Sequence, residues 1–517
     1  MTSIIFIALL SRAVTILLSI LSSQIVPTYD LSFQVIADPS NHPSSTIFES
    51  LCRWDGVYFI RLAQTNLIYE YEQFHAFFPF LPKIIHFLTH SITAPFNTEN
   101  IAATIPRSHY IIVGVLFINI TFIATAYVFY HLTLALYNNE RKAYYSTVLF
   151  CLSPASIFFS AIYTESPFAL FSFTFMLCHV RIQECINVKQ IVPWWLLCTM
   201  CGVLATFTRS NGIVLAAYPL HSIVARIYYE LTKQKGKRKK RKRNATNGKM
   251  KLKKINVAVV TLMLTTTAIL TVMPLVYVDH MGRSIYCKEA VKKEGLEEGM
   301  DVNVEDTMVD GEGGADLFRV ERPWCGSKGG SLYTFVQKEY WNQGLFNYWT
   351  LAQVPNFILA APILLTCFLL FYTYVHDKKI NLQLLGLFTE EEEDGVVGGG
   401  VHVKGIPFVF HCFALSVLCL VFMHVQVSTR FILASSPMPY WYWYDILNKQ
   451  NNINRIKMMK TKKKKKKEEK NDLDVLDDLE LKEDRFLCFT YSRWLLGYIW
   501  VFNVVGIVLF SSFYPWT

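Results

Sequence analysis

A carboxylate lies between a cation and an aromatic ring in the run from Arg53 to Gly56, which reads Arg-Trp-Asp-Gly. A neighbouring cation keeps an aspartate ionised, and an adjacent indole removes part of its hydration, so the carboxylate is suited to general-base work. The same run also fits an ordinary loop aspartate or a helix N-cap, where Asp is favoured. We take Asp55 as a candidate catalytic base and Trp54 as a candidate substrate-binding residue.

Two further carboxylates lie beside apolar or aromatic segments. Glu72 precedes the run from Ala76 to Pro79, Ala-Phe-Phe-Pro, which could form a substrate wall or simply begin a helix with Pro in its first turn. Glu165 lies where two apolar segments meet, so it could contact a substrate or only favour the positive N-terminal end of the next helix. Both are candidate substrate-binding residues.

An arginine occurs in the polar turn 208–212, which reads Thr-Arg-Ser-Asn-Gly. Turn chemistry accounts for the Asn and the Gly but not for the Arg. A guanidinium among hydroxyls and backbone amides suits phosphate binding, whereas snorkelling of the side chain to the membrane surface is the alternative. Arg209 and Asn211 are therefore candidate substrate-binding residues.

A second polar turn carries Arg430 together with His424 and Gln426. No lysine cluster accompanies these residues, so specific contacts are favoured over a general anion-binding surface. Asn347 and Gln353 add polar groups to an aromatic stretch that could otherwise be an interfacial belt. All five are candidate substrate-binding residues.

The cysteine pattern offers one candidate disulfide and no zinc site. Cys287 and Cys325 lie outside the apolar segments and could pair in an oxidising compartment. Most of the other cysteines lie inside apolar segments, where they act as small core residues. We therefore predict no metal-ligating residues and no cofactor, and whether a metal is required stays open.

The composition is that of a polytopic membrane protein. Of 517 residues, 52% are hydrophobic, 15% aromatic and only 17% charged, against roughly a quarter charged in soluble domains. The formal charge of +10 is concentrated in two lysine-rich loops, 233–254 and 457–470, which we interpret as topology signals rather than nucleic-acid contacts. We expect an all-α membrane fold that binds no nucleic acid.

A helix needs about 20 apolar residues to cross the hydrocarbon layer, and this criterion predicts about 11 transmembrane helices. They fall at residues 3–26, 108–137, 143–160, 164–183, 192–208, 211–229, 255–279, 355–375, 405–425, 431–446 and 493–513. We expect the first to be a retained helix and not a cleaved signal. With both lysine-rich loops in the cytoplasm, the N-terminus is cytoplasmic and the candidate site residues face the opposite side.

Five regions follow one another along the chain. They are a transmembrane module, 1–230, whose first extramembrane loop 27–107 carries the candidate base; a basic cytoplasmic loop, 231–254; a second transmembrane module, 255–450, with loop 280–354; a charged cytoplasmic insert, 451–492; and a final helix, 493–517. Within the first loop, residues 54–68 and 76–88 suit helices that lie at the membrane interface. Residues 294–316 are acidic and poor in apolar side chains, which predicts a disordered insertion.

Taken in order, these motifs resemble the PIG-V family, the GPI mannosyltransferase 2 enzymes. The resemblance rests on Trp54-Asp55, Ala76–Pro79, Ser153-Pro154-Ala155 followed by Tyr163–Ser166, Thr208–Gly212, Gly344–Phe357 and Gln426–Phe431. It covers most of the chain but not the acidic and lysine-rich inserts. It implies a GT-C type helix bundle with luminal interfacial helices in the endoplasmic-reticulum membrane, a luminal active site, and a match between Asp55 and the acidic residue of an early luminal loop.

The resemblance also implies a reaction: transfer of the second mannose, in α-1,6 linkage, from dolichyl-phosphate mannose to the GPI precursor, with inversion. The early carboxylate would act as base. Arg209 or Arg430 would stabilise the phosphate, and Glu165, His424 and Gln426 would position sugar hydroxyls. The implied partners are the lipid-linked donor and the acceptor, with room for a small membrane partner subunit.

Three other functions stay open from the sequence. A lipid transporter or flippase also has many spans, but it should carry polar groups at mid-membrane depth and broken helices in paired positions. A non-catalytic assembly subunit and a different GT-C mannosyl-transfer step are the others. The gathering of polar motifs on one face favours an enzyme whose site lies on that face.

Overall fold

The computed structural model describes eight stretches of the chain. They are residues 2–29, 46–93, 105–227, 257–287, 324–325, 330–377, 401–449 and 473–516. All regular secondary structure within them is helical, in agreement with the predicted all-α class. The basic loop 231–254, the acidic stretch 294–316 and much of the insert 451–492 lie outside the described residues.

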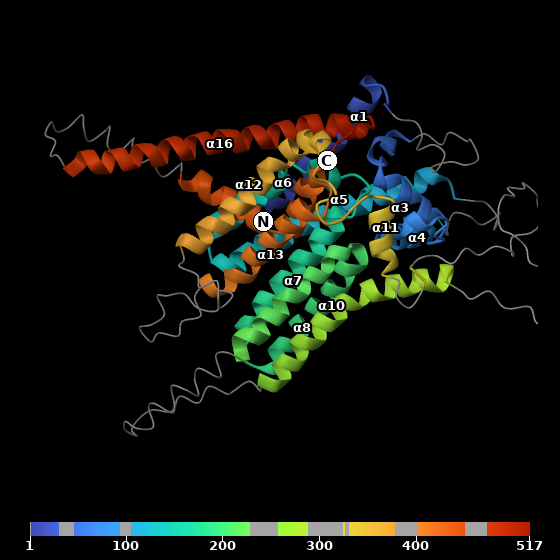
Figure 1. Cartoon of the computed structure of the whole chain (residues 1–517), viewed down its shortest axis with the longest axis horizontal. Helices are drawn as coiled ribbons and strands as arrows, with labels where there is room; N and C mark the ends of the chain where they lie inside the picture. Colours follow the sequence, from blue (N-terminus) through green and yellow to red (C-terminus); the bar gives the residue numbers. More distant parts are fainter. Residues whose placement is uncertain are drawn as a thin grey trace, which may run out of the picture.

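Six long apolar helices run broadly along the length of the molecule (Figure 1). They are α1 Thr2–Ile25, α5 Arg107–Tyr137, α8 Val188–Thr208, α10 Val257–Tyr286, α12 Val354–Asp377 and α16 Leu473–Ser511. Each contains a stretch long and apolar enough to cross a bilayer. Large apolar side chains remain exposed on them, for example Phe6 at 64% and Ile120 at 63%, as expected of helices whose outer faces contact lipid.

The other five predicted spans are helical too, but they are shorter, broken, or charged near their ends. Three of them are α6 Glu140–Cys151, α7 Glu165–Glu184 and α13 Val401–Val421. In the remaining two, η5 Ser210–Ala216 precedes a helix at 217–227, and α14 Ser428–Ser435 precedes a helix at 438–449. Length and composition therefore support six spans, and the total of about 11 stays a prediction.

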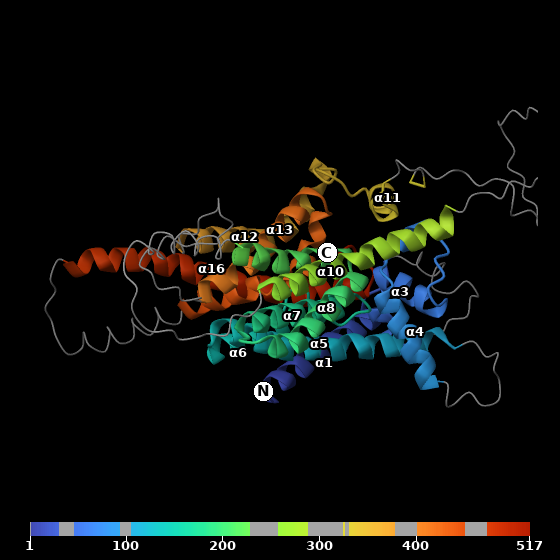
Figure 2. The same cartoon turned by 90° about the horizontal axis from the view of Figure 1, so that it is seen from below.

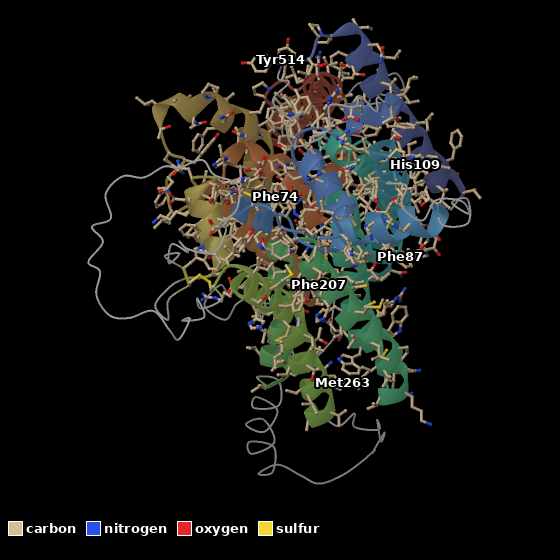
Figure 3. All side chains as sticks on the ribbon, turned by 90° about the vertical axis from the view of Figure 1, so that its right-hand side faces the viewer. Phe74, Phe87, His109, Phe207, Met263 and Tyr514 are labelled. Carbon is tan, nitrogen blue, oxygen red and sulfur yellow. A yellow bond between two sulfur atoms is a disulfide. The ribbon has the colours of Figure 1, made fainter. Side chains whose placement is uncertain are left out.

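Four short elements gather at one end of the bundle (Figures 1 and 2). They are α3 Asp55–Gln64, η2 Glu72–Ala76, α4 Phe80–Thr93 and α11 Leu332–Glu339. Helices α3 and α4 fall where the sequence predicts helices at 54–68 and 76–88, with different bounds. Viewed end-on, Phe74 of η2 lies near the centre of this end, and its ring meets Tyr58 of α3 edge-to-face at 5.3 Å between centroids (Figure 3).

A buried arginine in α1 fixes the loop between α6 and α7. Arg12 is 2% exposed, and its guanidinium donates to the carbonyl and the hydroxyl of Ser156 at 2.8 and 2.9 Å. It also donates to the hydroxyl of Ser160 at 3.0 Å and the carbonyl of Cys151 at 3.3 Å, and it lies 4.0 Å from the ring centre of Phe122. The sequence motifs did not single out Arg12, although a charge inside a span signals such a role.

Replacing Arg12 with Ala should destabilise the bundle, because carbonyls and hydroxyls that it satisfies would lose their buried donor. We expect a loss of about 2–4 kcal/mol, measured as a lower midpoint of thermal unfolding of the detergent-solubilised protein. The matched control is Arg141→Ala, because Arg141 is exposed on α6. Equal midpoints for the two variants would contradict this role for Arg12.

Candidate active site

A cavity of about 390 Å³ opens at the end of the bundle that carries α3 and α11. Its walls come from segments far apart in the sequence: the first loop, the turn before α7, the turn after α8, α11 and the chain that follows it, the turn before α14, and the end of α16. Its polar lining residues are Asp55, Tyr163, Thr164, Thr208, Arg209, Ser210, Asn211, Tyr333, Gln337, Gln343, His424, Gln426 and Arg430. The structure thus brings most of the predicted site residues to one cavity.

Asp55 is the first residue of α3 and is held there by its backbone. Its N–H donates to the hydroxyl of Tyr163 at 3.1 Å, and a carboxylate at a helix N-terminus is favoured by the helix dipole. Gly56 allows this close approach, because a Cβ at that position would lie 3.3 Å from the carbonyl oxygen of Ile162. The Asp55 side chain is 35% exposed, so its carboxylate can reach a molecule in the cavity.

Trp54, directly before α3, has an unusual backbone. Its φ of 52° is in the left-handed region, which a bulky residue rarely adopts and which often marks a functional constraint. The side chain is one of the cavity's lining residues, and its ring lies 5.6 Å from that of Phe513 between centroids. This conformation allows α3 to begin with Asp55 while the indole stays at the cavity wall.

Three lining residues, Asp55, Arg209 and Arg430, form a connected ion-pair network with Glu165, which does not itself line the cavity. Glu165, the first residue of α7, is fully buried, and its Oε1 lies 2.7 Å from Nη1 of Arg209 and 3.3 Å from Nη1 of Arg430. Arg430 also reaches Oδ2 of Asp55 at 3.4 Å. A buried carboxylate is tolerated only with such compensation, so Glu165 holds both guanidiniums in place.

The turn that carries Arg209 is shaped by a glycine. A Cβ at Gly212 would lie 2.5 Å from the backbone nitrogen of Thr206, so only glycine lets η5 fold back this closely onto α8. The same turn places Arg209 to donate to the hydroxyl of Thr164 at 3.2 Å, and Asn211 to donate to the hydroxyl of Ser435 at 3.0 Å. The sequence motif at 208–212 is therefore both a tight turn and part of the cavity.

Three polar atoms at and next to the cavity wall lack a hydrogen-bond partner. Among the described residues, Oε2 of Glu165, Nε of Arg430 and Oδ1 of Asn211 are buried without one. Buried polar atoms in native proteins nearly always have partners. Asn211 and Arg430 line the cavity and Glu165 contacts Arg430, so these unpartnered atoms gather at one wall of the cavity.

A chain of hydrogen bonds supports the opposite wall. The hydroxyl of Tyr348 donates to Oε1 of Gln426, and Nδ2 of Asn356 donates to the Tyr348 hydroxyl at 2.7 Å and to Oε1 of Gln353 at 2.6 Å. The ring of His424 stacks on Tyr348 at 4.6 Å between centroids. Gln426 and His424 line the cavity, whereas Gln353 lies behind it as a support.

Two further predicted binding residues lie away from the cavity lining. Glu72 is 8% exposed, and its two carboxylate oxygens accept from Nε1 of Trp324 at 2.5 Å and from the hydroxyl of Tyr340 at 2.9 Å. Asn347 is exposed in the turn that begins at Gly344. Their predicted contact with substrate stays a prediction.

His75, next to these aromatic residues, is uncharged at neutral pH. Burial lowers its pKa to about 4, although the charge of Glu72 acts in the opposite direction. Its ring stacks on Tyr69 at 4.1 Å between centroids. His75 does not line the cavity, whereas Asp55 and His424 do, so His75 is not placed to exchange a proton with a bound molecule.

Sequence reasoning missed several lining residues. Tyr163 lies between two predicted spans, and Tyr333 and Gln337 follow the acidic stretch. Pro515 and Trp516 lie just before the C-terminal residue. The predicted topology already placed all of them on the face of the candidate site, so their aromatic and amide side chains were available as a signal. The structure also joins Cys287 to Cys325 in a disulfide, close to α11.

The arrangement suits recognition of an anionic group beside a sugar-like molecule. Guanidiniums bind phosphate, aromatic rings contact apolar faces, and a partly exposed carboxylate can accept a hydroxyl proton. Within the described ranges, no group of three or more His, Cys, Asp and Glu side chains is placed to hold a metal ion. The lining residues themselves supply groups for acid–base and electrostatic interactions.

Comparison with known proteins gives the same picture. The family described as Mannosyltransferase (PIG-V) matches residues 1–517. GPI mannosyltransferase 2 of Drosophila melanogaster is 26% identical over 523 residues, which cover 99% of this chain and 98% of that protein. GPI mannosyltransferase 2 of Drosophila pseudoobscura pseudoobscura is 27% identical over 469 residues, with 90% and 86% covered. GPI alpha-1,6-mannosyltransferase 2 of Homo sapiens is 26% identical over 523 residues, with 98% and 96% covered. The resemblance found in the sequence motifs is thus confirmed, and the chain belongs to the mannosyltransferase (PIG-V) family.

Proposed function

We propose that this membrane mannosyltransferase adds the second mannose of the GPI anchor, in α-1,6 linkage, with dolichyl-phosphate mannose as donor. The names of its relatives support the GPI acceptor, and the name of the human relative supports the α-1,6 linkage. The observation that carries the proposal is the network in which Arg430 bridges Asp55 and the fully buried Glu165 within an aromatic-lined cavity. This network offers a base and a phosphate-binding cation side by side.

The location and topology follow from the same proposal. GPI assembly implies the endoplasmic-reticulum membrane, with the N-terminus in the cytoplasm and the cavity facing the lumen. The two transmembrane modules, 1–230 and 255–450, both supply cavity residues: Asp55 and Arg209 come from the first and Arg430 from the second. The segment that follows α16 completes the wall through Trp516.

The proposed mechanism is a single displacement with inversion. Asp55 accepts the proton of the acceptor 6-hydroxyl as that oxygen attacks the sugar carbon, and the dolichyl phosphate leaves as a stable anion, so no strong acid is needed. Arg430 is the better phosphate ligand of the two arginines, because its contacts of 3.3 and 3.4 Å are longer than the 2.7 Å contact of Arg209. Glu165 then positions the two arginines, and Arg209 compensates the buried negative charge of Glu165.

Replacing Asp55 with Asn should lower the rate of mannose transfer by about 10²–10⁴-fold, because the amide cannot accept the hydroxyl proton. Transfer from dolichyl-phosphate mannose to the GPI precursor in microsomes measures this. The control is Glu70→Gln on the same loop, whose carboxylate pairs with Arg61 outside the cavity. Near-normal transfer by the Asp55 variant would exclude it as the base.

The two arginines should differ in what they control. Arg430→Gln should lower kcat/KM for the donor by about 10- to 150-fold, which corresponds to loss of one charged hydrogen bond. It should lower thermal stability less than Arg209→Gln does, because its contact with Glu165 is the longer one. Arg209→Gln should instead lower the unfolding midpoint, because it leaves the fully buried Glu165 poorly compensated.

Donor titrations and thermal unfolding of both variants test this difference between the arginines. Arg61→Gln serves as the control, because Arg61 pairs with Glu70 and does not line the cavity. The assignment of phosphate binding to Arg430 fails if the donor effect belongs to Arg209 alone.

Depletion of the protein followed by lipid analysis tests the step in the pathway. We expect accumulation of the GPI precursor that carries one mannose, because the second transfer would be missing. Restoring the wild-type chain should remove that lipid, whereas the Asp55→Asn variant should not. Accumulation of a different intermediate would assign the enzyme to another mannosyl-transfer step.

A further inference from the structure

The cavity has a second, uncharged side, formed by α11 and the chain that follows it. Tyr333, Gln337 and Trp341 all line the cavity, and their spacing of four residues places the first two on one face of α11. They offer a hydroxyl, an amide and an indole. The arginines and carboxylates lie on other segments, so charged and neutral recognition groups are separated within one cavity.

Tyr333 connects this uncharged side to the arginine turn. Its hydroxyl lies 2.7 Å from that of Ser210, the residue after Arg209, and its ring meets Phe78 edge-to-face at 5.6 Å. Burial raises the pKa of Tyr333, so its hydroxyl stays protonated and can donate. The two sides of the cavity are therefore adjacent.

Helix α11 is too short to hold this position by itself. It has 8 residues and buries only Leu332 and Val336, whereas isolated helices shorter than about 12–15 residues are marginal in water. These two side chains pack against Trp324, beside the disulfide between Cys287 and Cys325. The direction in which Tyr333 and Gln337 face the cavity therefore depends on the contacts made by the opposite side of α11.

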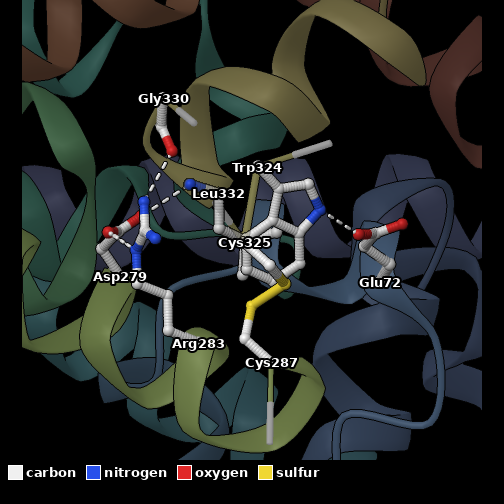
Figure 4. The surroundings of a disulfide bond; sticks show 8 residues. All are labelled: Glu72, Asp279, Arg283, Cys287, Trp324, Cys325, Gly330 and Leu332. Carbon is white, nitrogen blue, oxygen red and sulfur yellow. Dashed lines mark hydrogen bonds and ion pairs between the residues drawn. A yellow bond between two sulfur atoms is a disulfide. The ribbon is translucent and has the colours of Figure 1, made fainter. Parts of the chain in front are cut away.

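Glu72 holds that other face. Its carboxylate accepts from Nε1 of Trp324 at 2.5 Å, and Trp324 is next to disulfide-bonded Cys325 (Figure 4). Its other carboxylate oxygen accepts from the hydroxyl of Tyr340 at 2.9 Å. Glu72 belongs to η2, and Tyr340 directly follows α11. One carboxylate thus joins the first loop to both ends of the segment that contains α11.

The start of α11 is held by α10. Oδ1 of Asp279 accepts from the backbone N–H of Leu332 at 2.6 Å, and its Oδ2 lies 3.1 Å from Nε of Arg283. Arg283 also donates to the carbonyl of Gly330 at 2.7 Å (Figure 4). A Cβ at Gly282 would lie 2.1 Å from Leu332, so glycine permits this contact. Together with Glu72, these bonds fix the direction of the cavity face.

We propose that Tyr333, Gln337 and Trp341 bind the mannose of the GPI precursor that accepts the new sugar, and that Glu72 is a positioning residue for this subsite. The inference rests on the proposed function. Sugars are recognised by aromatic faces together with amides and hydroxyls, whereas the donor's phosphate is recognised by guanidinium groups. The separation within the cavity therefore assigns the acceptor to α11 and the donor phosphate to the arginine side.

Gln337→Ala and Tyr333→Phe should each raise KM for the GPI acceptor about five- to tenfold, because each substitution removes one neutral hydrogen bond. KM for the donor should stay unchanged. Thr334→Ala is the matched control, because Thr334 is exposed on the same helix. The subsite is disproved if the acceptor KM stays at the wild-type value or if the donor KM rises equally.

A binding measurement separates this inference from the proposed function. Saturation-transfer NMR of the detergent-solubilised full chain with methyl α-mannoside reads the subsite without any reaction. We expect a clear signal for the wild type that falls severalfold in Gln337→Ala but not in Thr334→Ala. An equal signal in all three proteins would overturn the subsite, whereas wild type that binds the mannoside but transfers no mannose would overturn only the reaction.

The role of Glu72 has its own readout. Glu72→Ala should raise the acceptor KM about as much as Gln337→Ala, because α11 loses the carboxylate that fixes it. Glu72→Gln should restore most of the acceptor affinity, since its amide oxygen can still accept from Trp324. Equal acceptor KM values for Glu72→Ala and wild type would contradict the positioning role, and so would equal impairment by the two variants.

Discussion

The fully buried carboxylate of Glu165 is the constraint around which the cavity is built. A charge without solvent requires close partners, and Glu165 has Arg209 at 2.7 Å and Arg430 at 3.3 Å. Those arginines come from the turn after α8 and from α14, so one carboxylate at the start of α7 brings both elements to the cavity. Asp55 joins the same network through Arg430. The charged side of the cavity is therefore a structural unit, and it is also the side where we propose that the donor phosphate binds.

The sequence predicted the composition of this unit better than its internal geometry. Lysine-rich loops set a topology that placed Asp55, Arg209 and Arg430 on one face, and the structure brings them into one cavity. No local sequence pattern predicts that Glu165 would lie between two arginines, because ion pairing depends on how the helices pack. For the same reason no local pattern predicts that the amide oxygen of Gln353, a candidate substrate-binding residue, accepts a hydrogen bond from Asn356.

The fold, like the site, was predictable from local sequence only in part. Six spans follow from apolar length alone, whereas α7 carries charge at both ends and is buried between α5 and α8, so hydropathy describes it poorly. Long-range contacts were beyond any local pattern: Glu72 and Trp324 are 252 residues apart in the chain. Arg12 is an intermediate case, because a charge inside an apolar helix is visible in the sequence but its partners near Ser156 are not.

Net neutrality of the network has a mechanistic consequence. Two guanidiniums balance two carboxylates, so a phosphate entering the cavity must compete for an arginine that is already paired. Arg430 is the one with the longer contacts, and its transfer to the phosphate would remove the cation from Asp55. The carboxylate would then be free to accept a proton only after the donor has bound. Such an order would keep the base paired, and unreactive toward hydroxyls, until both the sugar and its leaving group are in place.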